Sequence, residues 1–466
     1  MSQNTHLVYN IGDKPPLRKN LVYALQQLLA IMAATLLVPI LVDGSGTYMS
    51  QPAALCGAGF GTLFYLFMTR RKSPVFLGSS FAFISPLGSA VAFGFLGIFL
   101  GAVFAGLVYL VIALIIKKTG SAWVNKLLPP VVIGPTVALI GLSLCGSAVN
   151  NLNNTAADPA GYSLVAILVG VIAFVITVWA STKGTKGMKL IPFVIGILGA
   201  YVIALAVTLI WGQEPTSALH LVKTEAFNNM KLFTVPRFTF LGMFGAYPEA
   251  VNSLANPAAS AFKDGVVPEN YTALSGIISL LVLFAPVAFV TLAEHIADHK
   301  NLSTIIDRDL ITDPGLDHTL VGDGAGSIIG SFFGGCPNTT YGESVGCVAI
   351  TGNASVSTIA IAAIYCIVLS FFDPFVCFVN SIPSCIVGGV CIALYGFIAV
   401  SGLKMLQPVD LSDNRNLFVV AAILVPGIGG LTLNFGAVTI SSIATGLILG
   451  ILINVIFNRG NNKAKK

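Results

Sequence analysis

The chain has 466 residues, of which 55% are hydrophobic and only 9% are charged, and its mean hydropathy is +0.88. Soluble domains carry about 25% charged residues, so this composition excludes a water-soluble fold and places most of the chain in lipid. The net charge of +5 comes from short loops between apolar segments and does not indicate nucleic-acid binding.

Apolar runs of about 20 residues, the length that crosses a bilayer, recur along the whole chain. They lie near residues 21–43, 50–69, 95–117, 127–148, 162–181, 190–211, 276–297, 356–372, 383–401, 415–432 and 436–457. Two further apolar regions are broken by Gly, Ser, Pro and Thr: 74–93, which we count as one discontinuous span, and 324–353, which we count as two short spans. The sequence therefore predicts an all-α polytopic membrane protein with about 14 transmembrane segments.

Both termini are expected in the cytoplasm. Residues 1–20 are polar and contain no small-residue cleavage site, so the first span is expected to be an uncleaved transmembrane segment. Of the 24 Lys and Arg residues, 20 fall on the side of the membrane that holds this tail and the tail at 459–466. The positive-inside rule assigns that side to the cytoplasm. The four exceptions are Lys223, Lys231, Arg237 and Lys263.

The spans divide into two halves, residues 21–212 and 276–458, with seven spans each. Because seven is odd, the second half must be inverted relative to the first. Inverted repeats are typical of transporters, in which the substrate site lies at the repeat interface near the bilayer midplane. Residues 213–275 form an extracellular connection without recognisable chemistry.

The third span of each half is the broken one, at residues 78–83 and 337–343. Irregular backbone at membrane depth is tolerated only where protein buries it or where it lines a cavity. A Gly/Ser-rich helix packed tightly on a neighbour is the alternative. The matching positions favour a paired binding site.

Ionisable residues inside spans are candidate functional residues, and Glu294, Asp298 and Glu343 stand out. Glu294 and Asp298 are four residues apart and share one helix face. Two carboxylates this close disfavour simultaneous ionisation, so we expect the pair to share a proton. The alternatives are a structural hydrogen bond for either glutamate and ordinary solvation at a helix end for Asp298.

A metal site is a competing interpretation, because His295 and His299 also share a helix face. The metalloprotease pattern places Glu directly after the first His, whereas Glu294 precedes it here. The eight cysteines form no CxxC pair and are interpreted as small apolar residues. We expect no metal, no cofactor and no enzymatic activity.

Carboxylates accept hydrogen bonds, and the free N–H groups at helix starts donate them. A planar ligand with alternating N–H and C=O groups, such as uracil or an oxidised purine, matches both. An anionic substrate would be repelled by Glu294 and Glu343.

At these residues the sequence resembles the nucleobase–ascorbate transporter family, and within it the bacterial members that transport uracil. The resemblance covers nearly the whole chain. Its most specific segments are Leu77–Pro86 (LGSSFAFISP), Ala293–His295 (AEH), Asp313–Leu316 (DPGL) and Pro337–Glu343 (PNTTYGE).

The resemblance implies a core domain of spans 1–4 and 8–11 and a gate domain of spans 5–7 and 12–14. Spans 3 and 10 would each join a short strand to a half-helix, and the two strands would pair antiparallel. Glu294 and Glu343 would accept from the ring N–H groups of the base, and the backbone N–H groups of Phe81 and Gly342 would donate to its carbonyls. The positions that match pocket-lining residues are Ala34, Tyr341 and Tyr395.

Transport in similar proteins is proton symport, so the resemblance implies proton-coupled uracil uptake across the plasma membrane, with Asp298 and Glu294 as the coupling pair. Membrane lipid and a second copy of the chain are further expected partners. The chain departs from similar uracil transporters at Asp298, where His is common, at Gln26–Gln27, where a Gln-His pair is common, and in its longer 213–275 connection. Asp at the first position is common in purine-transporting relatives, so a xanthine or purine permease is the main alternative. An anion transporter of related fold is a remote one.

Overall fold

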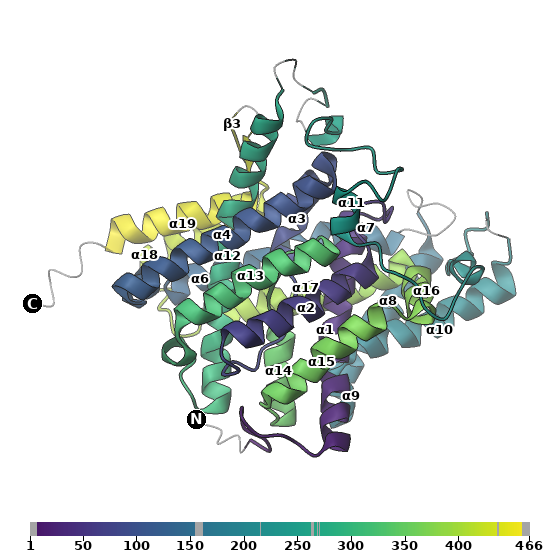
Figure 1. The fold of residues 1–466 in the computed structure, drawn as a ribbon, viewed down its shortest axis with the longest axis horizontal. Helices are drawn as coiled ribbons and strands as arrows, with labels where there is room; N and C mark the ends of the chain where they lie inside the picture. The colour runs from purple at the N-terminus through teal and green to yellow at the C-terminus, as the bar shows by residue number, and fades with distance from the viewer. Residues whose placement is uncertain are drawn as a thin grey trace, which may run out of the picture.

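The computed structural model describes residues 7–153, 162–214, 216–261, 265–267, 269, 271–435 and 438–458. Long helices cross the molecule side by side, and the described strands are short (Figure 1). The tail at 459–466 lies outside the described residues.

The first repeat contains seven membrane segments, three of them built from more than one helical piece. They are α1 (Leu17–Val42), α2 (Gln51–Met68), β1 (Leu77–Ser79) with η1 (Phe81–Phe83) and α3 (Ile84–Ala90), α4 (Gly94–Thr119) after η2 (Val91–Phe93), α6 (Pro130–Ser143) with α7 (Cys145–Asn153), α8 (Leu164–Thr182) and α10 (Pro192–Trp211). The short helices α5 (Ala122–Leu127) and α9 (Lys186–Leu190) lie between them. Proline occupies the first turn of α2, α6 and α10, where its missing N–H and fixed φ favour a helix start.

The second repeat has the same order of segments. They are α12 (Ala273–Ile306), α13 (Leu316–Gly334) after η5 (Ile311–Gly315), β2 (Asn338–Thr340) with α14 (Gly342–Thr351), α15 (Val356–Ser370), α17 (Ser384–Lys404) after α16 (Asp373–Ser381), α18 (Asn414–Ile428) and α19 (Ser442–Asn458). The connection between the repeats contains η3 (Thr224–Phe227), α11 (Thr239–Met243) and η4 (Ala259–Ala261). The predicted 7+7 arrangement is confirmed.

Three predicted boundaries need correction. Helix α12 continues to Ile306, beyond the expected end at 297, because hydropathy marks the apolar part of a helix and not its full length. The first of the two short spans expected in 324–353 is a continuous helix that begins at Leu316. The expected last span starts with an unpredicted hairpin of β3 (Leu433–Phe435) and β4 (Val438–Ile440), so its helix begins only at Ser442.

The inverted repeat is visible in the packing. Helix α2 packs against α13 and α15, and its counterpart α13 packs against α2 and α4. A Cβ on Gly57 of α2 would lie 2.4 Å from the carbonyl oxygen of Gly330 on α13, so this crossing requires glycine. A second group forms around α6 and α17, with α8 and α10 on one side and α18 and α19 on the other.

The two broken spans meet at the centre. Strands β1 and β2 pair antiparallel, with Leu77 opposite Thr340 and Ser79 opposite Asn338. Side chains complete the backbone hydrogen bonding of this small sheet: Leu77 N donates to Thr62 Oγ1 at 2.9 Å, and Ser327 Oγ donates to the Asn338 carbonyl. The irregular backbone is therefore satisfied by protein and not by lipid.

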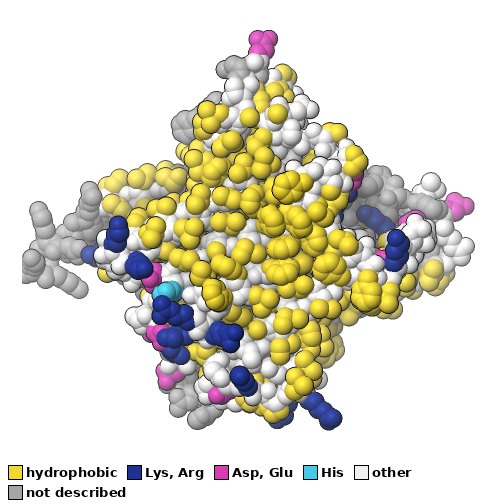
Figure 2. Space-filling model, viewed as in Figure 1, with side chains coloured by type: hydrophobic (Ala, Val, Ile, Leu, Met, Phe, Trp, Pro, Cys, Tyr) yellow, Lys and Arg dark blue, Asp and Glu magenta, His cyan; other side chains and the backbone are white. Residues whose placement is uncertain are grey.

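The surface is that of a membrane protein. Exposed hydrophobic side chains cover the face over α4, α13, α2 and α15, while most Lys and Arg in this view lie along the lower left edge and a few at the right (Figure 2). Among the described residues, seven helical segments are long and apolar enough to cross a bilayer, and three shorter apolar helices add to them. The chain is thus a multi-pass membrane protein.

The Asp313–Leu316 segment has a structural role at this charged edge. Lys72 Nζ lies 2.6 Å from Asp313 Oδ1, and Arg308 also donates to this carboxylate. Hydrogen bonds from Lys72 and Arg308 hold the pKa of Asp313 below its ordinary value. The bridge ties the α12–α13 loop to the segment that follows α2.

Candidate binding cavity

A cavity of about 500 Å³ lies where the two broken spans meet α12, α6 and α17. One wall is polar and comes from the paired repeats: Ser80, Phe81, Glu294, Asp298, Thr339, Tyr341, Gly342 and Glu343. The opposite wall is mostly apolar and comes from α6 and α17: Pro130, Ile133, Val137, Ile140, Phe397, Ile398 and Ser401. The cavity extends to Lys300, Thr304 and Lys404, at the C-terminal ends of α12 and α17.

Three carboxylates face this cavity. Glu294 and Asp298 lie one turn apart on α12, Glu343 lies in the first turn of α14, and all three are partly buried. Thr340 Oγ1 donates to Asp298 Oδ2 at 2.9 Å. A Cβ on Gly342 would lie 3.6 Å from Asp298 Oδ1, so Asp298 lies beside the start of α14. Because α12 continues past Asp298, this residue is inside the helix and not at a solvated end.

The cavity also receives two helix starts. Phe81 begins η1 and Gly342 begins α14, each with one residue between the helix and the preceding strand. Helix starts leave their first N–H groups without intrahelical acceptors and carry a partial positive charge. The structure therefore places donors from both repeats beside three acceptor side chains.

The α14 start is held by both repeats. Tyr341 OH donates to the Ser79 carbonyl at 2.6 Å, and Ser344 Oγ accepts from Phe76 N at 3.1 Å. Gln27 of α1 also donates to Ser344 Oγ. The second glutamine of the Gln26–Gln27 pair is thus a support for α14.

Two predicted pocket residues lie outside the cavity wall. Ala34, on α1, is buried among core side chains. Tyr395, on α17, lies behind Phe81, with ring centroids 5.7 Å apart in an edge-on arrangement. Both were placed by resemblance, and neither is among the residues that line this cavity; Tyr395 contacts its wall at Phe81.

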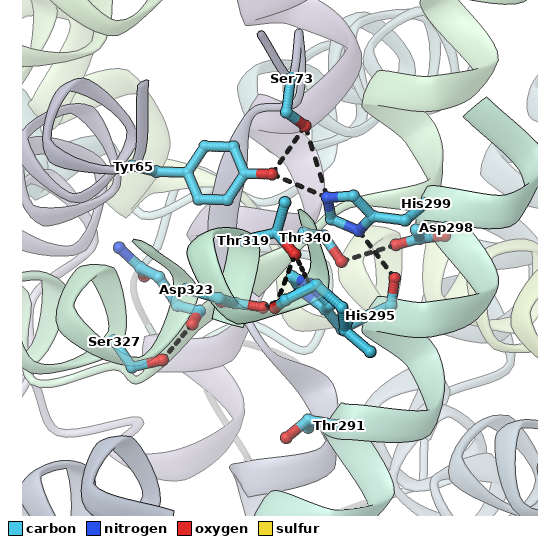
Figure 3. Close-up of polar contacts among 12 residues, drawn as sticks. Tyr65, Ser73, Thr291, His295, Asp298, His299, Thr319, Asp323, Ser327 and Thr340 are labelled. Atoms are coloured by element: carbon cyan, nitrogen blue, oxygen red, sulfur yellow. Dashed lines mark hydrogen bonds and ion pairs between the residues drawn. The ribbon is translucent and has the colours of Figure 1, made fainter. Parts of the chain in front are cut away.

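A buried polar network stands behind the carboxylates and was missed from the sequence. His295 Nδ1 lies 2.6 Å from Asp323 Oδ2, and both side chains are fully buried. His295 Nε2 lies 3.0 Å from Thr319 Oγ1, and His299 Nε2 lies 2.8 Å from Tyr65 OH. Figure 3 shows both histidines directed toward α13 and α2, while Asp298 turns to Thr340. Asp323 could have been found as a lone acid in an apolar, Gly-rich span.

The histidines do not form the metal pair considered from the sequence. The His295 ring lies between Asp323 and Thr319, and His299 Nδ1 contacts the His295 carbonyl oxygen at 2.8 Å. Among the described residues, no group of three His, Cys, Asp or Glu is arranged to hold a metal ion.

A cavity enclosed by inverted repeats, with carboxylates and helix starts at membrane depth, defines a membrane transporter. The profile of the permease family matches residues 18–435, and the chain belongs to that family. The uracil permease of Bacillus caldolyticus is 39% identical over 96% of this chain and 94% of its own length. The uracil permease of Escherichia coli (strain K12) is 32% identical over 97% and 94%.

Two solved structures share the fold. The transmembrane domain of the cyanobacterial bicarbonate transporter BicA has a TM-score of 0.59 at 12% identity and covers 94% of this chain and 97% of its own. The murine anion transporter Slc26a9, in the inward-facing state, has a TM-score of 0.63 at 12% identity, over 96% of this chain and 69% of its own. At this identity the likeness concerns the fold alone.

Proposed function

We propose that this permease carries uracil into the cell across the plasma membrane, in symport with protons. The observation that carries the proposal is the pairing of Glu294 and Glu343 with two helix starts in one cavity. Relatives that are uracil permeases, 32% to 39% identical over nearly the full length, support uracil as the base.

In the proposed complex the base lies between the two broken spans. Glu294 and Glu343 accept hydrogen bonds from its ring N–H groups, and the N–H groups of Phe81 and Gly342 donate to its carbonyls. Tyr341 and the apolar side chains of α6 enclose its faces. Asp298 exchanges the transported proton, since it shares a helix face with Glu294 and lines the same cavity.

We further propose that α1–α4 and α12–α15 form the core domain, and α6–α10 and α16–α19 the gate domain. The grouping of helix contacts supports this division, and the cavity lies along the boundary. Movement of core against gate would then expose the site alternately to the two sides. With the lysine-rich loops in the cytoplasm, the cavity as described opens inward. A homodimer stays a prediction.

The test is uptake of radiolabelled uracil by cells that express the chain, with competition by unlabelled uracil, xanthine, uric acid and cytosine. Uracil should compete best. Stronger competition by xanthine or uric acid would favour the purine permease, for which Asp298 is the supporting feature. Anion transport is disfavoured, although two structural neighbours transport anions, because three carboxylates line the cavity.

A further inference from the structure

A second, entirely apolar cavity of about 350 Å³ lies between α12 and α19, away from the substrate site. Ala285 and Phe289 of α12 line one side, and Ile448 and Leu452 of α19 line the other. Leu127, the last residue of α5, closes one end. Ile448 is 37% exposed and Leu452 is 51% exposed, so this α12–α19 groove is open on its outer side.

The groove has a defined depth in the membrane. Ala285 and Phe289 lie near the middle of the 34-residue α12. Leu127 ends α5, the short helix between α4 and α6 that also contains Lys126. The groove therefore runs from the lysine-rich side of the protein to about the middle of the bilayer, which is the depth of an acyl chain in that leaflet.

The lining restricts the occupant to an apolar chain. All eight lining residues are apolar, so a solute that needs hydrogen bonds would lose them on entry. An empty groove would forfeit dispersion contacts along both helices. The corresponding cavity of the first repeat, between α1, α10 and α16, measures only about 40 Å³, so side chains fill the equivalent place there.

An apolar groove cannot by itself select one lipid, because lipid tails are as apolar as its lining. Selection must come from the headgroup. Lys126 is exposed and directly precedes Leu127, and Lys117 and Lys118 are exposed at the end of α4. Within the described part of the chain, none of these three lysines forms an ion pair. The lysines at this end of the groove therefore favour a lipid headgroup with a net negative charge over a zwitterionic headgroup.

We propose that the α12–α19 groove binds one anionic phospholipid of the cytoplasmic leaflet. Its acyl chain lies between α12 and α19, and its headgroup phosphate lies at Lys126, with Lys117 and Lys118 nearby. The site is separate from the uracil cavity, so it can be tested whether or not the chain transports uracil.

The test is native mass spectrometry of the delipidated full chain titrated with phosphatidylglycerol or phosphatidylcholine. Wild type should retain one phosphatidylglycerol more tightly than phosphatidylcholine. Lys126→Gln should weaken phosphatidylglycerol binding about five-fold, the effect of one lysine near an anionic surface, and leave phosphatidylcholine unchanged. Ala285→Trp, which fills the groove, should weaken both lipids.

Two matched controls sharpen the test. Lys186→Gln removes an exposed lysine from α9, and Leu281→Trp enlarges an exposed residue one turn from Ala285; both should bind as wild type does. Equal binding of the two lipids to wild type, or equal losses in Lys126→Gln and Lys186→Gln, would overturn the headgroup site. Normal lipid binding by Ala285→Trp would overturn the proposal that the acyl chain lies in the groove. If Ala285→Trp does not fold, Ile448→Trp serves as a second groove-filling variant.

Discussion

Glu294, Asp298 and Glu343 are three carboxylates that line the cavity. Carboxylates inside a membrane are costly, yet three of them converge on one cavity from two different repeats. In the proposed complex Glu294 and Glu343 accept hydrogen bonds from the base, whereas Asp298 accepts a hydrogen bond from Thr340 of strand β2.

The first prediction concerns these two glutamates. Glu343→Gln replaces an acceptor oxygen with an NH₂ group that faces a ring N–H of uracil. Losing a hydrogen bond to a charged group costs about 1.5–3 kcal/mol, so uracil affinity should fall about 10- to 150-fold. Glu294→Gln should behave similarly in calorimetric binding to purified protein. Glu214→Gln, in the loop after α10, is the control; near-normal binding by both cavity variants would remove these glutamates from the site.

The second prediction separates binding from proton coupling. Asp298→Asn keeps the size of the side chain but cannot carry the transported proton. We expect uracil affinity to stay within a few-fold and exchange of internal for external uracil to survive, because exchange needs no net proton movement. Accumulation driven by a proton gradient in liposomes should be lost. A variant that still concentrates uracil under an imposed gradient would show that another group couples transport to protons.

At the scale of elements, the β1–β2 pair decides where the two helix starts lie. A strand of three residues has little stability of its own, so side chains from α2, α13 and α1 support each strand and the start of α14. Gly78 lies at a close approach, because a Cβ there would lie 2.5 Å from two ring atoms of Tyr341. The position of the Tyr341 ring in the second repeat therefore requires a glycine at position 78 in the first repeat.

The third prediction tests this dependence. Gly78→Ala should displace the Tyr341 ring and break its hydrogen bond to the Ser79 carbonyl. Overpacking costs about 1–3 kcal/mol of folding stability, so the variant should melt at a lower temperature. Uracil affinity should fall as well, because the displaced Tyr341 lines the cavity. Gly88→Ala is the matched control, because a Cβ at Gly88 has no neighbour within 4 Å. Equal effects of the two substitutions on binding and melting temperature would refute the steric link.

At the scale of the whole molecule, the inverted repeat links topology to function. The same helix packing occurs twice with opposite orientation, so one arrangement can open a central site to either side of the membrane. Which side is the cytoplasm then decides whether the described cavity opens inward.

The fourth prediction fixes that orientation. A cysteine at Lys186, the first residue of α9, should be labelled only from the cytoplasm, and a cysteine at Asn153, the last residue of α7, only from outside. The native cysteines must be replaced first, above all Cys145, which is exposed. Labelling of position 153 from the cytoplasm alone would overturn the span count.

The sequence by itself determined the membrane environment, the two halves, the broken spans and the three cavity carboxylates. Each of these features is visible in a short stretch of sequence, because a membrane span requires a long apolar run, in which Gly/Ser breaks and charged residues stand out. Only the tertiary structure decided that Tyr395 lies behind Phe81, that α12 continues past Asp298, and that Asp323 pairs with His295. These features depend on which residues from distant segments meet in space, and the sequence pattern of one segment contains no information about its neighbours.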